Sequence, residues 1–280
     1  MMRRRAVVLG ILIAAGCQSP SSDSSSTTQA VRPASDIASV FNGSRGAWVD
    51  LTHAFSDASI FWPTDTQGFA LEKLAYGPTP GGWFYASYRY SGAEHGGTHL
   101  DAPIHFAEGR QTNDQIPLSN LVGPAVVVDV SDRVNPDYRV SVDDLTGWEA
   151  KHGQIPKGAI LLVRTGWDAR YDNRGAYLGT NRTGPEAVKE LHFPGLAPEA
   201  AQWLVANRSI DAFGIDTASI DYGQSTDFRT HVTLYQKNIP GFENVANLGR
   251  LPPVGSFVVA LPMKIKDGSG GPLRIVAYVP

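Results

Sequence analysis

The sequence predicts a single α/β domain in which buried strands alternate with helices or long loops. Short apolar runs that are rich in β-branched residues and bounded by glycine, proline or polar residues are typical of buried strands. Such runs cover residues 124–130, 159–164, 210–215, 257–261 and 273–279. The 280-residue chain is 42% hydrophobic and 18% charged, which is ordinary for a globular domain with a substantial core.

Residues 1–17 have the pattern of an export signal. Arg3, Arg4 and Arg5 precede an apolar run that is too short to span a bilayer, and the run ends in Ala-Ala-Gly-Cys at Cys17. This ending resembles the lipobox of bacterial lipoproteins, in which the cysteine becomes the lipidated first residue; a stray cysteine after an ordinary signal peptide is the alternative. We therefore expect an exported lipoprotein, facing the periplasm or the cell surface, that contacts a membrane only through its lipid anchor.

Residues 18–45 are rich in serine, threonine and glutamine, so we expect a flexible tether before a catalytic domain at residues 46–280. Cys17 is the only cysteine in the chain, which excludes an internal disulfide bond. The net charge is −3, and the domain has no run of lysine or arginine. This charge pattern argues against nucleic acid as a partner and favours a small molecule.

Aromatic residues before the middle of the chain are candidates for a substrate pocket. Phe61 and Trp62 are adjacent, and Trp83, Phe84 and Tyr85 form a second group. Concave sites for flat molecules are commonly lined by such side chains. Packing in the core is the alternative for both groups.

A concentration of histidines at residues 95–105 indicates a divalent-metal site and hence an enzyme. The segment reads His-Gly-Gly-Thr-His-Leu-Asp-Ala-Pro-Ile-His and holds three of the chain's seven histidines. His99 and Asp101 are two residues apart, so on an extended backbone both side chains leave the same face and can reach one ion. Imidazole and carboxylate ligands suit zinc, manganese or iron(II), and the lack of a cysteine ligand favours an open catalytic site. A chance cluster of histidines is the alternative.

Two helices are expected in the second half of the chain. The first covers residues 197–207, and the second covers residues 227–237 and must end before Pro240. His231 then lies near the start of a helix and Glu243 lies just beyond its end. The two side chains can therefore face one pocket from different elements.

Residues 171–191 are polar, rich in glycine and arginine, and without a predicted element. Long loops of this kind are frequently lids or interface arms, and an ordinary surface insertion is equally compatible with the sequence. We expect the length of this segment to help to distinguish subfamilies.

The motif at residues 95–105 resembles the signature of the cyclase family of metal-dependent hydrolases, which includes bacterial kynurenine formamidase, isatin hydrolase and the trans-dienelactone hydrolases. The resemblance covers essentially everything after about residue 46. It extends through Leu-Thr-His at 51–53, Arg-Thr-Gly-Trp at 164–167, Gly-Ile-Asp-Thr at 214–217 and Glu-Asn-Val-Ala-Asn-Leu at 243–248. It implies a swivelling β/β/α fold with a central barrel-like sheet, and a homodimer or higher homo-oligomer.

The resemblance also implies roles for individual residues. His105 would be the acid/base. Apart from the resemblance, we expect Thr98 to help to orient the substrate, with Phe61 and Trp62 as candidate pocket residues. The residues that would hold a divalent metal, zinc or manganese, are His95, His99, Asp101, His231 and Glu243. The last two resemble the distal pair of the formamidase branch, which leaves open whether one or two ions bind.

We therefore expect a hydrolase that opens an amide, lactam or lactone bond of a small aromatic molecule by metal-activated water. The chain length and the sequence Leu-His-Phe-Pro-Gly-Leu at 191–196 resemble isatin hydrolase and the trans-dienelactone hydrolases more than kynurenine formamidase, and N-formylkynurenine hydrolysis is the alternative. From another class, His99, Asp101 and His231 can form the triad of a non-haem iron oxygenase. A non-catalytic metal-binding lipoprotein is a third reading. No Gly-x-Ser-x-Gly or His-Glu-x-x-His motif is present, which disfavours serine hydrolases and the common zinc peptidases.

Overall fold

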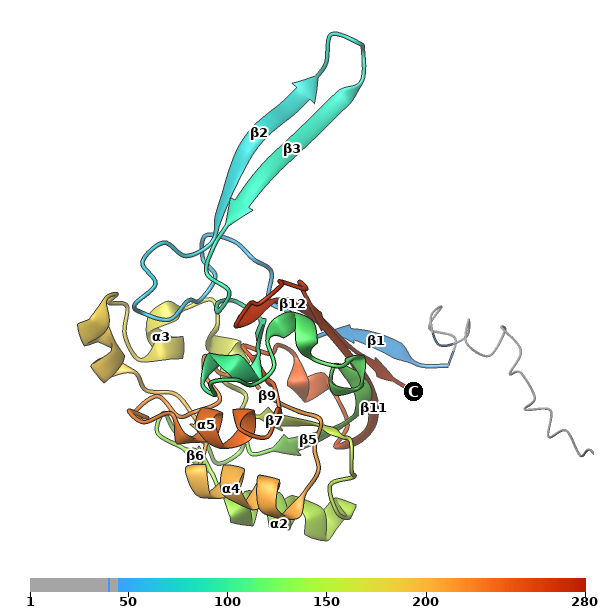
Figure 1. The fold of residues 1–280 in the computed structure, drawn as a ribbon, viewed down its shortest axis with the longest axis vertical. Helices are drawn as coiled ribbons and strands as arrows, with labels where there is room; N and C mark the ends of the chain where they lie inside the picture. Colours follow the sequence, from blue (N-terminus) through green and yellow to red (C-terminus); the bar gives the residue numbers. More distant parts are fainter. Residues whose placement is uncertain (1–39, 41–44) are drawn as a thin grey trace, which may run out of the picture.

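The computed structural model describes Val40 and residues 45–280, and a closed sheet lies at its centre (Figure 1). In these residues the sheet has eight strands, in the order β1-β12-β11-β5-β7-β9-β10-β4. A further pairing of β12 with β4 closes seven strands into a barrel, and β1 extends the edge of β12 outside it. The strands are β1 (Ala47–Asp50), β4 (His99–Asp101), β5 (Val122–Asp129), β7 (Ile160–Arg164), β9 (Ala212–Ile215), β10 (Gly241–Glu243), β11 (Val254–Pro262) and β12 (Gly270–Val279). The predicted α/β class with a barrel-like sheet is confirmed.

The parallel half of the barrel accounts for the apolar runs in the sequence. β5, β7, β9 and β10 pair in parallel, whereas β11 and β12 pair antiparallel. Along β7, Ile160 and Leu162 pack inside the barrel, and Leu161 and Val163 pack outside against the helices. Because both faces are covered, such a strand consists almost entirely of apolar residues. The five predicted strands correspond to β5, β7, β9, β11 and β12.

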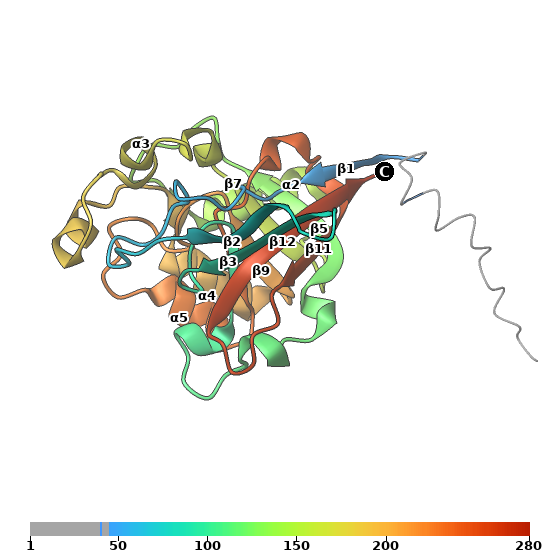
Figure 2. The same ribbon diagram turned by 90° about the horizontal axis from the view of Figure 1, so that it is seen from above.

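Helices α2 (Val142–His152) and α4 (Pro198–Asn207) cover the outer face of the parallel strands (Figures 1 and 2). The predicted helix at 197–207 is α4, with Pro198 at its first position. The predicted helix at 227–237 is α5 (Arg229–Tyr235), which is shorter at both ends. Helix α2 was not predicted. Its start is fixed by a capping box in which the Ser141 hydroxyl and the Asp144 carboxylate each accept the other's backbone N–H.

Residues 171–191 are not the long structureless loop that the sequence suggested. They contain helix α3 (Arg174–Leu178) and the 3₁₀ helix η5 (Pro185–Glu190). Tyr177, Leu178 and Leu191 are completely buried, in a small core with Ile60 and Phe193. The segment is therefore packed against the body of the protein and does not form a free lid.

Short elements connect the main ones. Strands β6 (Arg139–Val140) and β8 (Gly195–Leu196) form a separate two-stranded sheet. The remaining 3₁₀ helices are η1 (Pro103–His105), η2 (Asn113–Gln115), η3 (Leu118–Asn120), η4 (Trp167–Arg170) and η6 (Leu248–Arg250).

A long hairpin of β2 (Ala70–Pro78) and β3 (Phe84–Ser91) projects from the barrel (Figure 1). It was not predicted. Trp83, Phe84 and Tyr85 lie at its tip, between 52% and 63% exposed, so the expectation that they line a substrate pocket is wrong. An exposed hairpin and a buried strand share the same alternating pattern, and the sequence alone did not distinguish them.

The predicted signal at residues 1–17 and nearly all of the predicted tether at 18–45 lie outside the described residues. Among the residues that are described, no helix has the length and apolar character needed to cross a membrane.

Candidate metal centre

Strand β4 carries the centre of the histidine motif and lies between β10 and β12. His99 and Asp101 leave the same face, as the spacing predicted: His99 Nε2 lies 3.1 Å from Asp101 Oδ1. Leu100, between them, points into the barrel core. Glu243 of β10 is directly opposite His99, and its Oε2 lies 3.5 Å from His99 Nε2. Cross-strand partners share a face of a sheet, so three potential ligands meet here.

Two glycines leave room for neighbouring side chains to approach Asp101. Gly241 and Gly270 are the cross-strand partners of Asp101 on its two sides. A Cβ atom at Gly241 would lie 2.5 Å from Tyr235 Oη, and one at Gly270 would lie 2.6 Å from His95 Cε1. The Tyr235 hydroxyl donates a hydrogen bond of 2.9 Å to Asp101 Oδ2. A side chain at either glycine would push these groups away from the carboxylate.

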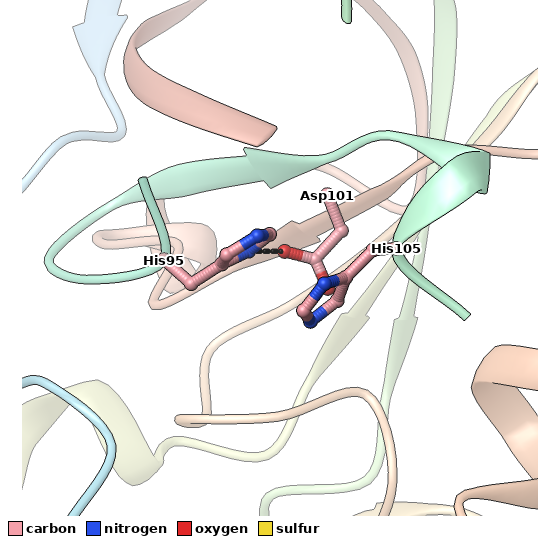
Figure 3. A group of neighbouring side chains, drawn as sticks. All are labelled: His95, Asp101 and His105. Carbon is pink, nitrogen blue, oxygen red and sulfur yellow. Dashed lines mark hydrogen bonds and ion pairs between the residues drawn. The ribbon is translucent and has the colours of Figure 1, made fainter. Parts of the chain in front are cut away.

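His95 and His105 approach Asp101 from the loop before β4 and from η1 after it (Figure 3). His95 Nδ1 lies 2.7 Å from Asp101 Oδ1. The rings of His95 and His105 are stacked, with centroids 3.7 Å apart. The potential ligand atoms of all three residues lie within 4.8 Å of one another, as do those of His99, Asp101 and Glu243. Asp101 is common to both groups.

His231 and Glu243 meet in this same cluster although they lie on different elements. His231 is on α5, and its Nε2 lies 3.1 Å from Glu243 Oε1 and 3.4 Å from Asp101 Oδ2. All of the predicted ligands, His95, His99, Asp101, His231 and Glu243, therefore lie together, with His105 beside them. His105 is close enough to Asp101 to serve either as a ligand or as the acid/base.

The imidazoles of His99 and His231 are oriented so that Nε2 faces the carboxylates. His99 Nδ1 lies 3.0 Å from the carbonyl oxygen of Gly97, and His231 Nδ1 lies 2.6 Å from Asp221 Oδ2, so in each ring Nδ1–H is the donor. In the neutral form of each ring, Nε2 therefore carries the lone pair. Such contacts at the far nitrogen fix the tautomer of metal-binding histidines.

His95 is held by the same kind of contact at the other nitrogen. Its Nε2 lies 2.8 Å from Ser269 Oγ. The Ser269 hydroxyl itself donates to Glu94 Oε2 at 2.6 Å, so it must accept from His95 Nε2–H. With Nε2–H so engaged, the neutral ring would offer its Nδ1 lone pair to a cation shared with Asp101, whose Oδ1 lies 2.7 Å away.

The buried Nε2 of His99 indicates whether the residues of this site suit a cation. Among the described residues, His99 Nε2 is buried and has no hydrogen-bond partner, yet two carboxylate oxygens surround it. A buried lone pair beside buried carboxylates is unfavourable unless a proton or a cation lies between them. Three imidazoles and two carboxylates suit a divalent transition-metal ion. The residues present therefore fit such an ion.

The charges of the cluster shift the pKa values of its members. Burial lowers the pKa of His99, but the adjacent carboxylates of Asp101 and Glu243 outweigh it and raise the pKa to about 9. The pKa of His231 is likewise raised well above its ordinary value, by the surrounding carboxylates and against the effect of burial. An imidazolium has no lone pair for a metal. Protons and a metal ion therefore compete for the same nitrogens.

The cluster forms the polar floor of a cavity of about 320 Å³. Phe61 and Trp62 line this cavity, as predicted, and Phe106, Phe228 and Ile60 add to its apolar wall. Trp62 and Phe228 contact each other edge to face, with ring centroids 6.3 Å apart. An aromatic wall above a metal-binding floor is suited to a small flat molecule with one reactive polar group.

Thr98 lies behind this cavity instead of lining it. Its side chain is completely buried; the hydroxyl accepts the His53 N–H at 2.9 Å and donates to the Asn244 carbonyl at 2.7 Å. Asn244 in turn donates to the Gly97 carbonyl at 2.7 Å. Thr98 thus supports the turn that orients His99.

Several residues of the site were not predicted from the sequence. Phe106 and Phe228 line the cavity, and Phe228 has a left-handed backbone (φ 49°) that is uncommon for a bulky residue. Three further residues contact the potential ligands: Asp221 contacts His231, Ser269 contacts His95, and Tyr235 contacts Asp101. Only Phe106, which follows His105 directly, had a local signal; the others come from distant parts of the chain.

Comparisons with known proteins agree with this geometry. A family model described as "Putative cyclase" matches residues 49–222. Isatin hydrolase from Roseibium aggregatum is 32% identical over 226 residues, which cover 77% of this chain and 83% of that protein. Kynurenine formamidase from Salinibacter ruber is 29% identical over 233 residues, which cover 82% and 96%.

Solved structures give the same result. Isatin hydrolase A from Ralstonia solanacearum superposes with a TM-score of 0.78 and 35% identity, covering 91% of this chain and 99% of that chain. An isatin hydrolase bound to the product analogue thioisatinate has a TM-score of 0.78 at 30% identity, covering 88% and 97%. His231 and Glu243 lie beyond the residues matched by the family model, so their place in the site depends on the geometry above.

Proposed function

Because the chain belongs to the cyclase family, we propose that it is a metal-dependent hydrolase that opens the ring of a small aromatic lactam such as isatin. The observation that carries this proposal is the convergence of three imidazoles and two carboxylates beneath an aromatic cavity. The identity of 32–35% to isatin hydrolases over most of the chain supports the choice of substrate class.

We propose that the ion is Mn²⁺ or Zn²⁺. Its ligands come from Asp101 and from His95 and His99, whose Nδ1 and Nε2 lie 2.7 and 3.1 Å from Asp101 Oδ1, with His231 and Glu243 available to complete its coordination or to hold a second ion. When bound, the ion supplies a Lewis acid and brings the pKa of a water molecule toward neutrality. Asp101 contacts His95, His99 and His231, so it is the residue on which the site depends most.

His105 is proposed as the proton shuttle. Burial lowers its pKa to about 4, against the charge of Asp101, so the imidazole is neutral at pH 7 and can accept a proton from the attacking water. The stack with His95 holds the ring at the edge of the cavity. The same nitrogen then donates the proton to the leaving nitrogen of the amide.

The aromatic wall of the cavity positions the substrate and limits the access of water. Trp62 is braced by Phe193 and Phe228, both edge to face at 6.3 Å. Phe106 packs on Phe228 at 5.0 Å. Offset and edge contacts of this kind hold a flat ring in a defined orientation, so that its carbonyl faces the polar floor.

Hydrolysis of N-formylkynurenine is the second candidate, because kynurenine formamidases are 25–29% identical to this chain. Comparing kcat/KM for isatin and N-formylkynurenine distinguishes the two. We expect isatin to be preferred; a clear preference for the formamide would assign the chain to the other branch.

Turnover without oxygen separates hydrolysis from oxygenase chemistry. Asp101 does lie 3.1 Å from His99 and 3.4 Å from His231, the residues of the possible iron-binding triad, but that interpretation leaves His95, His105 and Glu243 without a role. We expect ring opening in anaerobic buffer with no co-substrate. A strict requirement for oxygen would support the oxygenase, and no turnover of any tested amide or lactone would support a binding protein.

We also propose that the mature chain begins at a lipidated Cys17 and is exported. This rests on the sequence of residues 3–17 alone. Intact-mass measurement of protein from a bacterial host should show acyl chains on Cys17, and Cys17→Ser should abolish them. An unmodified cysteine, or cleavage elsewhere, would contradict the anchor and leave the proposed activity untouched.

A further inference from the structure

The segment 171–191 reaches the metal centre through one buried tyrosine. Helix α3 lies at the periphery of the molecule (Figures 1 and 2), yet its Tyr177 is completely buried. The Tyr177 hydroxyl donates to Asn244 Oδ1 at 2.8 Å. Asn244 directly follows Glu243, a proposed metal ligand, and lines the catalytic cavity. A segment that the proposed chemistry does not use therefore contacts a residue of the site.

The side-chain amide of Asn244 has one orientation that satisfies both of its ends. Its Nδ2 donates to the Gly97 carbonyl at 2.7 Å, and its Oδ1 accepts from the Tyr177 hydroxyl. In the reversed orientation, Oδ1 would face the carbonyl oxygen of Gly97, and two acceptors would meet without a proton between them. Burial raises the pKa of Tyr177 well above its ordinary value, so the hydroxyl keeps its proton and remains a donor.

The Gly97 carbonyl accepts from two donors, which its two lone pairs allow. The first donor is Asn244 Nδ2, and the second is His99 Nδ1–H at 3.0 Å. Gly97 has a left-handed backbone (φ 57°), and a Cβ atom there would lie 2.7 Å from the Phe55 ring. Glycine permits this conformation but does not fix it. The Asn244 amide therefore holds the carbonyl in the direction that His99 requires.

The main chain of Asn244 is held by other contacts. Its backbone N–H donates to the Thr217 carbonyl at 2.8 Å, and its carbonyl accepts from Thr98 Oγ1 at 2.7 Å. Its backbone is left-handed (φ 53°), which asparagine tolerates better than most residues do. Because these contacts do not involve Tyr177, the specific contribution of the tyrosine hydroxyl is to hold the side-chain amide.

We propose that Tyr177 is a positioning residue of the metal centre. It acts through the Asn244 amide and the Gly97 carbonyl to direct Nε2 of His99 toward the carboxylates. Three hydrogen bonds, of 2.8, 2.7 and 3.0 Å, connect the tyrosine hydroxyl with the imidazole. The inference rests on the proposed metal site, and it makes the packing of segment 171–191 a condition for tight metal binding.

The Tyr177 hydroxyl also has a longer contact, of 3.2 Å, with the carbonyl oxygen of Asp216. Asp216 directly follows β9, so this contact ties α3 to the barrel. Loss of the hydroxyl can therefore lower the stability of the fold as well as the affinity for a metal. The two effects are separated by measuring metal binding and thermal unfolding on the same variants.

Tyr177→Phe removes the hydroxyl and keeps the ring. In the full chain we expect it to raise the Kd for Mn²⁺ about 10-fold, as measured by competition with a chromogenic chelator. Tyr138→Phe is the matched control, because the Tyr138 hydroxyl donates to Asp144 at the start of α2, away from the cavity. The control should lower the midpoint of thermal unfolding and leave the Kd unchanged. Equal Kd values for the two variants would overturn the proposal.

Asn244→Gly tests the route through the amide, because glycine keeps the left-handed backbone and removes the side chain. We expect the Kd for Mn²⁺ to rise about 10–100-fold. Adding Tyr177→Phe to this variant should cause no further rise, because residues that act in one chain are not additive. If Tyr177→Phe raises the Kd as much in Asn244→Gly as in the wild type, Tyr177 does not act through Asn244 and the proposal fails.

NMR of the Zn²⁺-loaded protein follows the orientation of His99 directly. Tyr177→Phe should speed the exchange of the His99 Nδ1–H proton with solvent and leave that of His231 Nδ1–H, which contacts Asp221, unchanged. Equal acceleration at both histidines would show a general loosening of the fold and would contradict a positioning role. A wild type that binds neither Mn²⁺ nor Zn²⁺ would refute the proposed function itself, whereas equally tight binding by the wild type and Tyr177→Phe would refute this inference alone.

Discussion

Replacing Asp221 with asparagine should weaken metal binding without removing a proposed ligand. Asp221 is 1% exposed, and its Oδ2 lies 2.6 Å from His231 Nδ1 and 3.1 Å from the His231 backbone nitrogen. Its Oδ1 accepts from Ser225 Oγ at 3.1 Å and from the Thr230 N–H at 3.3 Å. Burial acts to raise the pKa of Asp221, but the contacts with His231 outweigh it and lower the pKa. The carboxylate therefore fixes His231 with Nε2 toward Glu243.

The expected loss follows from counting these donors. Each of the two oxygens of Asp221 accepts from two donors, so the NH₂ group of an asparagine, which replaces one oxygen, must face two of the four donors. Hydrogen bonds to charged groups contribute about 1.5–3 kcal/mol each. Substitutions behind a metal-binding histidine typically reduce metal affinity about 10–100-fold. We expect the Kd for Mn²⁺ to rise by this factor in Asp221→Asn.

Competition with a chromogenic chelator at fixed pH measures this Kd. Asp137→Asn is the matched control, because Asp137 Oδ1 lies 2.6 Å from His192 Nδ1 in an exposed pair that does not line the cavity. The control should change the Kd by no more than about twofold. If Asp221→Asn binds Mn²⁺ as tightly as Asp137→Asn does, the contact behind His231 has no role in metal affinity and the reasoning fails.

Three further predictions concern the proposed chemistry. Dialysis against a strong chelator should abolish isatin turnover and Mn²⁺ or Zn²⁺ should restore it; full activity of protein shown by elemental analysis to be metal-free would contradict the metal mechanism. His105→Ala should lower kcat about 10²–10⁴-fold with unchanged metal content, because a proton shuttle is not a ligand; loss of metal would instead make His105 a ligand. Trp62→Ala should raise KM for isatin by about 10-fold through the loss of aromatic contact, as measured by steady-state kinetics, with little change in kcat; a fall in kcat at constant KM would place Trp62 in the chemical step.

The parts of the fold that the sequence predicted are those whose cause is local. Strand β7 is buried on both faces and so is a continuous apolar run, and the two-residue spacing of His99 and Asp101 placed both on one face of β4. The hairpin was missed because its alternating aromatic residues have the same pattern whether they face a core, a cavity or a partner. Asp221 and Ser269 could not be found, because only the folded chain brings them behind His231 and His95.

The metal centre also shows how the fold can hold two buried carboxylates close together. Without a cation, Asp101 and Glu243 must be neutralised by protons on the imidazoles, and the pKa of His99, about 9, reflects this. A histidine whose folded pKa lies above its unfolded value of 6.5 stabilises the fold fully below pH 6.5, and that contribution is lost as the pH rises through about 9. Metal binding has the opposite dependence, because each ligand nitrogen must first lose its proton. Protons at low pH and a metal ion at higher pH would therefore neutralise the same two carboxylates.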